Sequence, residues 1–251
     1  MFYTRIPISF NLDYSDEKLN QSTRYFPLIG YIVGFLSFVI FYILQIVLPL
    51  EIAVIGSFLT GILITGAFHE DGLADFFDGF GGGWTTEKIL DIMKDSRVGT
   101  YGMVATIIQL ALKFYALLYL VQALESYGLI WIGMLFITYH SIARFFAIQL
   151  CFMLDYVRAD ETSKAKPIAK KQSWKEVVGV YIFGLIPIIV LCSINPLLFL
   201  SVCPLIGLIF YFKAYLKKWI GGYTGDCLGA VEQISEGLFL IAFLALWNYL
   251  S

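Results

Sequence analysis

Charged residues are scarce in this sequence. Only 14% of its 251 residues are Asp, Glu, Lys or Arg, whereas 59% are hydrophobic. A soluble protein carries roughly 25% charged residues, because its surface faces water. The chain therefore has too little charge to cover a globule of its size, and lipid must face much of its surface.

A cysteine cluster and an excess of positive charge are missing as well. The four cysteines are scattered without the spacing of a metal site, and three lie within or beside apolar stretches, where a reduced thiol is simply a small apolar side chain. We therefore expect no disulfide framework. A formal net charge of −2 argues against a nucleic-acid partner. The first 25 residues contain three acids and no apolar run, so we expect no cleaved signal peptide.

Long apolar stretches dominate the chain. A helix needs about 20 apolar residues to cross the hydrocarbon core of a bilayer. Seven stretches meet or approach this length, at roughly 26–48, 52–68, 98–123, 128–153, 176–194, 196–215 and 228–250. They predict an all-α, polytopic transmembrane bundle of about seven spans. No linker marks a second domain, so we expect one domain over 1–251.

The basic residues fall on alternate connections. Of 17 Lys and Arg, three precede the first span, three lie in segment 69–97, six in 154–175 and three at the end of the sixth span. The connections 49–51, 124–127 and 195 have none. Because cytoplasmic loops carry the excess of Lys and Arg, we predict a multi-pass cell-membrane protein whose N-terminus and long polar segments face the cytoplasm.

Segment 69–97, between the second and third spans, is acidic, with seven acids and three bases. If residues 69–79 continue the second span as a helix, Asp71, Asp75 and Asp78 share one face. A solvated acidic surface is the plain alternative, since like charges one turn apart cost only a few tenths of a kcal/mol. Two features favour a metal site instead. Phe76, Phe77 and Phe80 alternate with the aspartates, which indicates a partly buried site. Unpaired negative charge beside a membrane is also energetically costly, and a bound cation would neutralise it.

A second short helix is expected after the glycines at 81–83. Thr85 or Thr86 is a suitable N-cap, and Asp91 and Asp95 would lie one turn apart. Oxygen ligands without cysteine favour Mg2+ or Mn2+ over zinc. Aspartate pairs of this kind suit phosphoryl transfer, in which Mg2+ neutralises phosphate charge and a remaining carboxylate accepts a proton.

Basic side chains and a glycine-rich turn supply candidate substrate contacts. Lys94 and Arg97 would bind phosphate oxygens, with interfacial anchoring as the alternative. The turn that opens the seventh span leaves backbone N–H groups open to an anion. Its candidates are Gly222, Thr224, Gly225 and Asp226, although Asp226 is equally suited to be an N-cap.

The remaining candidates lie in and beside the spans. Glu232 and Glu236 lie one turn apart on an apolar helix, where acids are functional candidates; pairing with Lys113 or Arg144 is the structural alternative. Arg144 would otherwise bind a phosphate. In segment 154–175, Arg158 and Lys164 would draw in a nucleotide, or else contact anionic lipid. Gly30 and Gly34 form a GxxxG pair, which helix packing explains.

These motifs resemble the cobalamin synthase (adenosylcobinamide-GDP ribazoletransferase) family. The matching blocks are FYTRIPI at 2–8, HEDGLADFFDGFGGG at 69–83, KDSRVGTYG at 94–102, DYVRADETSKAKP at 155–167 and GGYTGDCLGAVEQISE at 221–236. They cover nearly the whole chain in order. The acidic block together with the KDSR segment is the most specific part.

The resemblance implies a Mg2+-dependent membrane transferase of cobalamin biosynthesis. A hydroxyl of α-ribazole or its 5′-phosphate attacks the diphosphate of adenosylcobinamide-GDP, GMP leaves, and a phosphodiester remains. Our own hypothesis from the residues is that the metal ligands are Asp71, Asp75 and Asp78 with Asp91 or Asp95. We predict Asp75, Asp78, Asp95 and Arg97 as the catalytic residues, with one of the aspartates as the base.

Two alternatives remain open at this stage. A CDP-alcohol-type phospholipid synthase has a loosely similar aspartate pattern and performs the same class of reaction. A cation or metabolite transporter would use the acids for coordination, but it is expected to keep them near mid-membrane on broken helices. The oligomeric state is also open, a homo-oligomer included.

Overall fold

Helices make up nearly all of the computed structural model, which describes residues 4–7, 15–158 and 173–250. The elements, in chain order, are α1 Asp16–Ser22, η1 Thr23–Tyr25, α2 Phe26–Gln45, α3 Leu50–Thr65, α4 Phe68–Gly82, α5 Thr86–Ile92, α6 Thr100–Leu124, η2 Glu125–Tyr127, α7 Leu129–Met153, α8 Trp174–Leu191, η3 Pro196–Val202, α9 Cys203–Ile220 and α10 Gly225–Leu250. The predicted all-α class is confirmed.

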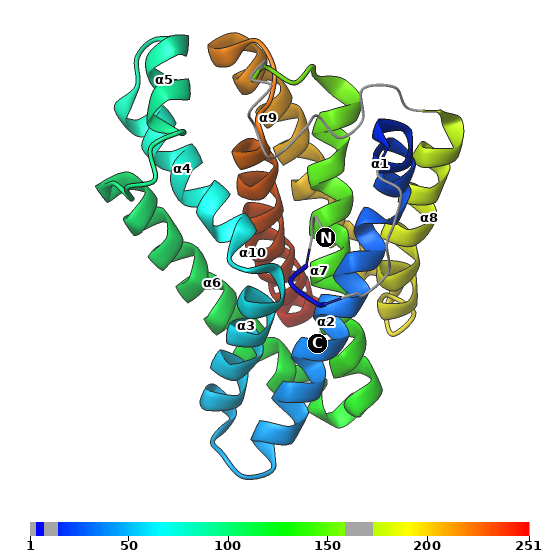
Figure 1. Ribbon diagram of the computed structural model, residues 1–251. Coiled ribbons are helices and arrows are strands. Elements are labelled where there is room, and N and C mark those ends of the chain that lie inside the picture. The colour runs from blue at the N-terminus through cyan, green and yellow to red at the C-terminus, as the bar shows by residue number, and fades with distance from the viewer. Residues whose placement is uncertain (1–3, 8–14, 159–172, 251) are drawn as a thin grey trace.

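Six helical segments of the described chain are long and apolar enough to cross a membrane, and α3 with α4 would make a seventh. This confirms a polytopic bundle of about seven spans. The central helices are α7 and α10, in which 72% and 67% of the most apolar window is buried, against 33% in each of the other four. The α2–α3 and α6–α7 connections lie at one end of the bundle, and α5 and the α9–α10 connection lie at the other (Figure 1).

The second span does not continue into the acidic helix. Gly66 and Ala67 both adopt left-handed backbone angles (φ 73° and 60°), and their N–H groups both donate to the Ile62 carbonyl. The chain turns by 87° between α3 and α4. The prediction of one continuous helix is therefore wrong, because two successive left-handed residues end a right-handed helix. Residues 69–79 are helical, but they belong to the separate helix α4.

Helices α2 and α7 pack through the predicted GxxxG pair. A Cβ atom built on Gly30 would lie 2.6 Å from the His140 carbonyl oxygen, and one on Gly34 would lie 2.5 Å from that of Phe136. Both contacts are with backbone, which cannot rotate away. The absence of side chains at these two positions therefore sets the distance between the helices.

Substituting Gly34 with alanine is expected to lower the thermal unfolding midpoint of the protein in detergent. The added methyl group forces α2 away from α7, and overpacking of this kind costs about 1–3 kcal/mol. Gly207→Ala on α9 is the matched control, because a Cβ there meets nothing within 4 Å. Equal midpoints for the two variants would contradict this account of the α2–α7 contact.

Candidate active site

Helices α4 and α10 cross in near backbone contact at two glycines. A Cβ on Gly72 would lie 3.1 Å from Cα and O of Asp226, and one on Gly229 would lie 3.1 Å from the His69 carbonyl oxygen. A side chain at either position would push the helices apart. The crossing therefore brings the acidic helix of the 69–83 block directly against the first turn of the last helix.

Three carboxylates gather at this crossing. Asp75 is half-buried, and its electrostatic neighbours are the carboxylates of Asp226, Asp71 and Asp78 and the guanidinium of Arg158. Asp71 is exposed. We call Asp71, Asp75 and Asp226 the acidic face. Two of its members were predicted as metal ligands, whereas the sequence indicated Asp226 only as a substrate contact or helix cap.

Backbone pairing holds Arg158 beside this face. Tyr223 N–H donates to the Asp155 carbonyl (2.9 Å), and Val157 N–H donates to the Tyr223 carbonyl (3.0 Å). The guanidinium of Arg158 then lies 2.8 Å from the Asp226 carboxylate. Gly222 permits this pairing, because a Cβ there would collide with the Asp155 carbonyl oxygen. The structure thus brings predicted Arg158, Gly222 and Asp226 together.

Thr224, not Asp226, caps α10. The buried Thr224 hydroxyl accepts a hydrogen bond from Cys227 N–H at 3.3 Å, as an N-cap side chain does. The Asp226 carboxylate instead accepts a long hydrogen bond from the Thr224 hydroxyl (3.5 Å) and pairs with Arg158. Gly225, the first residue of α10, lies beside open space, since a Cβ there would meet nothing within 4 Å.

Asp78 joins α4 to the start of α6. Its two carboxylate oxygens accept hydrogen bonds from Gly99 N–H (2.6 Å) and Gly102 N–H (2.9 Å), and its side chain is buried. These are N–H groups that the first turn of a helix leaves without an intrahelical partner. The geometry therefore gives Asp78 a capping role beside its predicted catalytic and metal-binding roles, which stay predictions.

The second aspartate pair does not form on one helix. Thr85 caps α5 as predicted, accepting from Lys88 N–H at 3.3 Å, but α5 ends at Ile92 and Asp95 lies beyond it. The expected one-turn spacing of Asp91 and Asp95 on a common helix is therefore wrong, because the chain leaves the α-helix after Ile92 through tighter turns, in which Lys94 N–H donates to the Asp91 carbonyl and Asp95 N–H to the Ile92 carbonyl. Asp91 is exposed at the end of α5.

Asp95 pairs with Arg97 two residues later. The carboxylate and guanidinium lie 2.5 Å apart, and the Arg97 side chain is 86% exposed. Hydrogen bonds from the Arg97 side chain and backbone lower the pKa of Asp95 to about 2, so this carboxyl is ionised at neutral pH. Lys94 is exposed in the same segment. Predicted Lys164 lies outside the described residues.

Within the described part of the chain, no group of three or more His, Cys, Asp and Glu side chains is arranged to hold a metal ion. The five predicted ligands are thus not gathered around one point. The acidic face nevertheless suits Mg2+, which is usually held by one or two carboxylates together with substrate phosphates and water. Its donors are all carboxylate oxygens, the ligand type that Mg2+ prefers.

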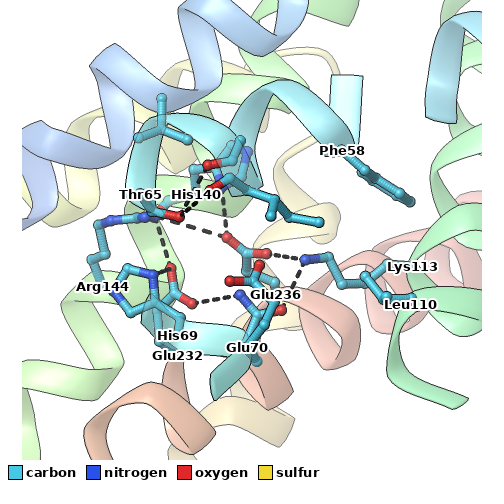
Figure 2. Close-up of a pocket in the computed structure, with 14 residues that line it drawn as sticks. Phe58, Thr65, His69, Glu70, Leu110, Lys113, His140, Arg144, Glu232 and Glu236 are labelled. Carbon is cyan, nitrogen blue, oxygen red and sulfur yellow. Dashed lines mark hydrogen bonds and ion pairs between the residues drawn. The ribbon is translucent and has the colours of Figure 1, made fainter. Parts of the chain in front are cut away.

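Arg144 lies inside the bundle, in a buried polar cluster (Figure 2). It is 1% exposed, and its guanidinium lies 2.9 Å from Glu232 and 3.8 Å from Glu236. Glu236 also contacts the Lys113 ammonium and, at 2.6 Å, Nδ1 of His140. The structural alternative for these acids, pairing with Lys113 and Arg144, is therefore the one that the structure shows.

The comparisons with known proteins point to one family. The model of the cobalamin-5-phosphate synthase family matches residues 1–244. Three curated relatives are named adenosylcobinamide-GDP ribazoletransferase. The protein of Shewanella oneidensis is 46% identical over 94% of this chain and 87% of its own length. The protein of Leptospira interrogans is 42% identical over 99% of this chain and 94% of its own length. The protein of Shewanella amazonensis is 40% identical over 98% of this chain and 93% of its own length.

No solved structure matches the chain. The family match covers both sequence blocks that meet at the α4–α10 crossing, and the curated relatives align over almost their full lengths. The chain belongs to the cobalamin-5-phosphate synthase family.

Proposed function

We propose that this chain transfers the cobinamide phosphate of adenosylcobinamide-GDP to a hydroxyl of α-ribazole or its 5′-phosphate, with release of GMP. The relatives carry the name of this reaction. The observation that carries the proposal is the junction of α4 and α10, where three carboxylates and one arginine meet. A phosphoryl transfer needs such a site, with oxygens for a divalent cation and a fixed positive charge for phosphate.

The reaction forms one bond and breaks another. The acceptor oxygen bonds to the phosphorus next to cobinamide, the bridging P–O bond of the diphosphate breaks, and the bridging oxygen leaves with GMP. The hydroxyl proton passes to a carboxylate acting as general base. Asp75 is our candidate, because it is half-buried whereas Asp71 is exposed, and because the third carboxylate, Asp226, is already ion-paired with Arg158. A proton on Asp75 also reduces the repulsion among its neighbours.

The other members of the face would bind the diphosphate. Asp71 and Asp226 would hold Mg2+, which when bound neutralises charge on the diphosphate oxygens and the departing phosphate. Arg158, ion-paired with Asp226, is positioned to turn its guanidinium to a phosphate oxygen. Asp91, Asp95, Arg97 and Lys94 stay candidates for metal and phosphate contacts from the exposed segment around α5.

A cytoplasmic location of this face is part of the proposal. It is supported by the basic residues of segments 69–97 and 154–175, which flank the site in sequence, and by the lack of Lys and Arg in connections 49–51 and 124–127. Adenosylcobinamide-GDP carries the charge of its diphosphate, and α-ribazole and its 5′-phosphate carry polar hydroxyl groups, so the substrates would reach the face from the aqueous phase. The lipid bilayer contacts the exposed apolar surfaces of the outer helices.

A substrate comparison tests the proposed reaction. The full chain in lipid nanodiscs is expected to release GMP from adenosylcobinamide-GDP only when α-ribazole or its 5′-phosphate is present. Release of CMP from CDP-diacylglycerol and a polar alcohol would instead support the phospholipid-synthase alternative. Transport of a metabolite without any GMP release would support the transporter.

Chelation tests the metal requirement separately. We expect EDTA to abolish GMP release and added Mg2+ to restore it, because the carboxylates of the acidic face would otherwise repel the diphosphate. The measurement is the initial rate of GMP release before chelation, in EDTA and after Mg2+ addition. Undiminished turnover in EDTA would rule out the metal role.

A further inference from the structure

Four helices contribute ionisable side chains to the buried cluster in Figure 2. They are α4 with His69 and Glu70, α6 with Lys113, α7 with His140 and Arg144, and α10 with Glu232 and Glu236. Ionisable groups within a membrane bundle are expensive, and apolar contacts between helices need none of them. The proposed reaction does not use this cluster directly, because most of its side chains are buried inside the bundle. The cluster therefore calls for another role.

The two glutamates of α10 contact different helices. Glu236 contacts Lys113 on α6 and His140 and Arg144 on α7. Glu232 contacts Arg144 at 2.9 Å and, in addition, Nδ1 of His69 on α4 at 3.7 Å. Among the described residues, Glu232 is therefore the one of these two acids whose carboxylate has a polar contact with α4, the helix that carries Asp71 and Asp75.

The position of α4 depends on contacts beyond its own connection. The 87° turn at Gly66–Ala67 separates it from α3, so α3 does not fix its direction as a continuous helix would. At its far end, Asp78 is bound to the first turn of α6. At its near end, His69 meets Glu232. Asp71 and Asp75 lie between these two points of attachment.

The His69–Glu232 contact lies one helical turn from the glycine crossing. His69 is three residues before Gly72, and Glu232 is three residues after Gly229. A cavity of about 10 Å³ adjoins it, which suits one water molecule. His69 and Glu232 both line that cavity, and the 3.7 Å between Nδ1 of His69 and Oε1 of Glu232 is too long for a direct hydrogen bond. One water in the cavity would bridge these two atoms and complete the attachment.

We propose that Glu232 is a positioning residue for the transfer reaction. Through His69 it holds the first turn of α4 against α10, and so sets the spacing of Asp71 and Asp75 from Asp226. Arg144 keeps the Glu232 carboxylate directed to this point. The proposal rests on the proposed function, since it concerns the geometry of the same acidic face.

Glu232→Gln and Glu236→Gln form a matched pair for testing this role. Both remove one buried carboxylate charge from the same face of α10, but only the first lies at α4. For Glu232→Gln we expect a fall in kcat of about 100-fold, as for a small misplacement of catalytic groups, a higher Mg2+ concentration for half-maximal rate, and little change in KM. For Glu236→Gln we expect a lowered thermal midpoint but a kcat per folded molecule close to that of the parent.

A variant of the other residue in the contact, His69, tests the proposal independently in case Glu232→Gln does not fold. His69→Gln should lower kcat in the same way, and the double variant should lose little more than either single one, because the two residues act as one unit. The proposal is overturned if Glu232→Gln or His69→Gln keeps the parental kcat and Mg2+ dependence, or if kcat falls in both glutamate variants only in proportion to their midpoints. A parental enzyme that releases no GMP would overturn the proposed function itself.

Discussion

Asp75→Asn is expected to abolish GMP release while leaving the protein inserted and folded. Asparagine has nearly the same shape but accepts no proton, and loss of a general base typically costs about 10²–10⁴-fold in rate. Asp75 is half-buried among the carboxylates of Asp71, Asp78 and Asp226, so neutralising it also relieves repulsion. The thermal midpoint should therefore stay the same or rise. The measurement is kcat for GMP release at saturating Mg2+.

Glu87→Gln is the matched control for Asp75→Asn. Glu87 is an exposed acid in the first turn of α5, within the same acidic segment and away from the α4–α10 crossing. Its loss lowers the negative charge of the segment by the same amount, and the rate should remain near that of the parent. An equal loss of rate in the two variants would show that Asp75 acts only through the negative charge of the segment and is not the base. A parental rate in both would also rule out Asp75 as the base.

Arg144→Met is expected to cause the largest loss of stability. The guanidinium is fully enclosed and faces both Glu232 and Glu236, and methionine fills much of its volume without charge. Removing one partner of a buried ion pair leaves an uncompensated charge and costs about 3–5 kcal/mol. We expect a large fall in the unfolding midpoint in detergent, and much less protein recovered from the membrane fraction.

An exposed arginine provides the comparison for Arg144→Met. Arg97 is also ion-paired, to Asp95, but its side chain is in contact with solvent. Surface pairs contribute little to stability, so Arg97→Gln should leave the unfolding midpoint unchanged. A midpoint for Arg144→Met equal to that of Arg97→Gln would mean that the buried cluster rearranges without cost.

The membrane spans are the part of the fold that the sequence predicts best. An apolar run of about 20 residues has few alternatives to a spanning helix. Lipid offers no hydrogen-bond partners, so a segment inside the bilayer must pair all of its own backbone N–H and C=O groups, as a helix does. The 87° turn before α4 could not be predicted in this way. Gly66 alone would be an ordinary helix terminator, but Ala67 in the left-handed region has no signature in the sequence.

The acidic face shows where local patterns stop being informative. The one-turn spacing of Asp71 and Asp75 predicts a shared face, and the structure has both on α4. That Asp226 meets them depends on the close approach of Gly72 and Gly229, which are far apart in sequence. Asp78 is a third aspartate on the same side of α4, yet its oxygens bind backbone N–H groups at the start of α6, a contact that only the three-dimensional packing creates.

The shortness of α3 has a consequence for the surrounding lipid. With 16 residues at 1.5 Å each, the helix is about 24 Å long, less than the hydrocarbon thickness of about 30 Å. If α3 crosses the bilayer without α4, we expect this hydrophobic mismatch to draw the two leaflets together around it at a modest energetic cost. The acidic face, which begins just past the end of α3, would then lie at the bottom of a thinned patch of membrane, and the acyl-chain length of the host lipids would help to set how far water and substrate must descend to reach it.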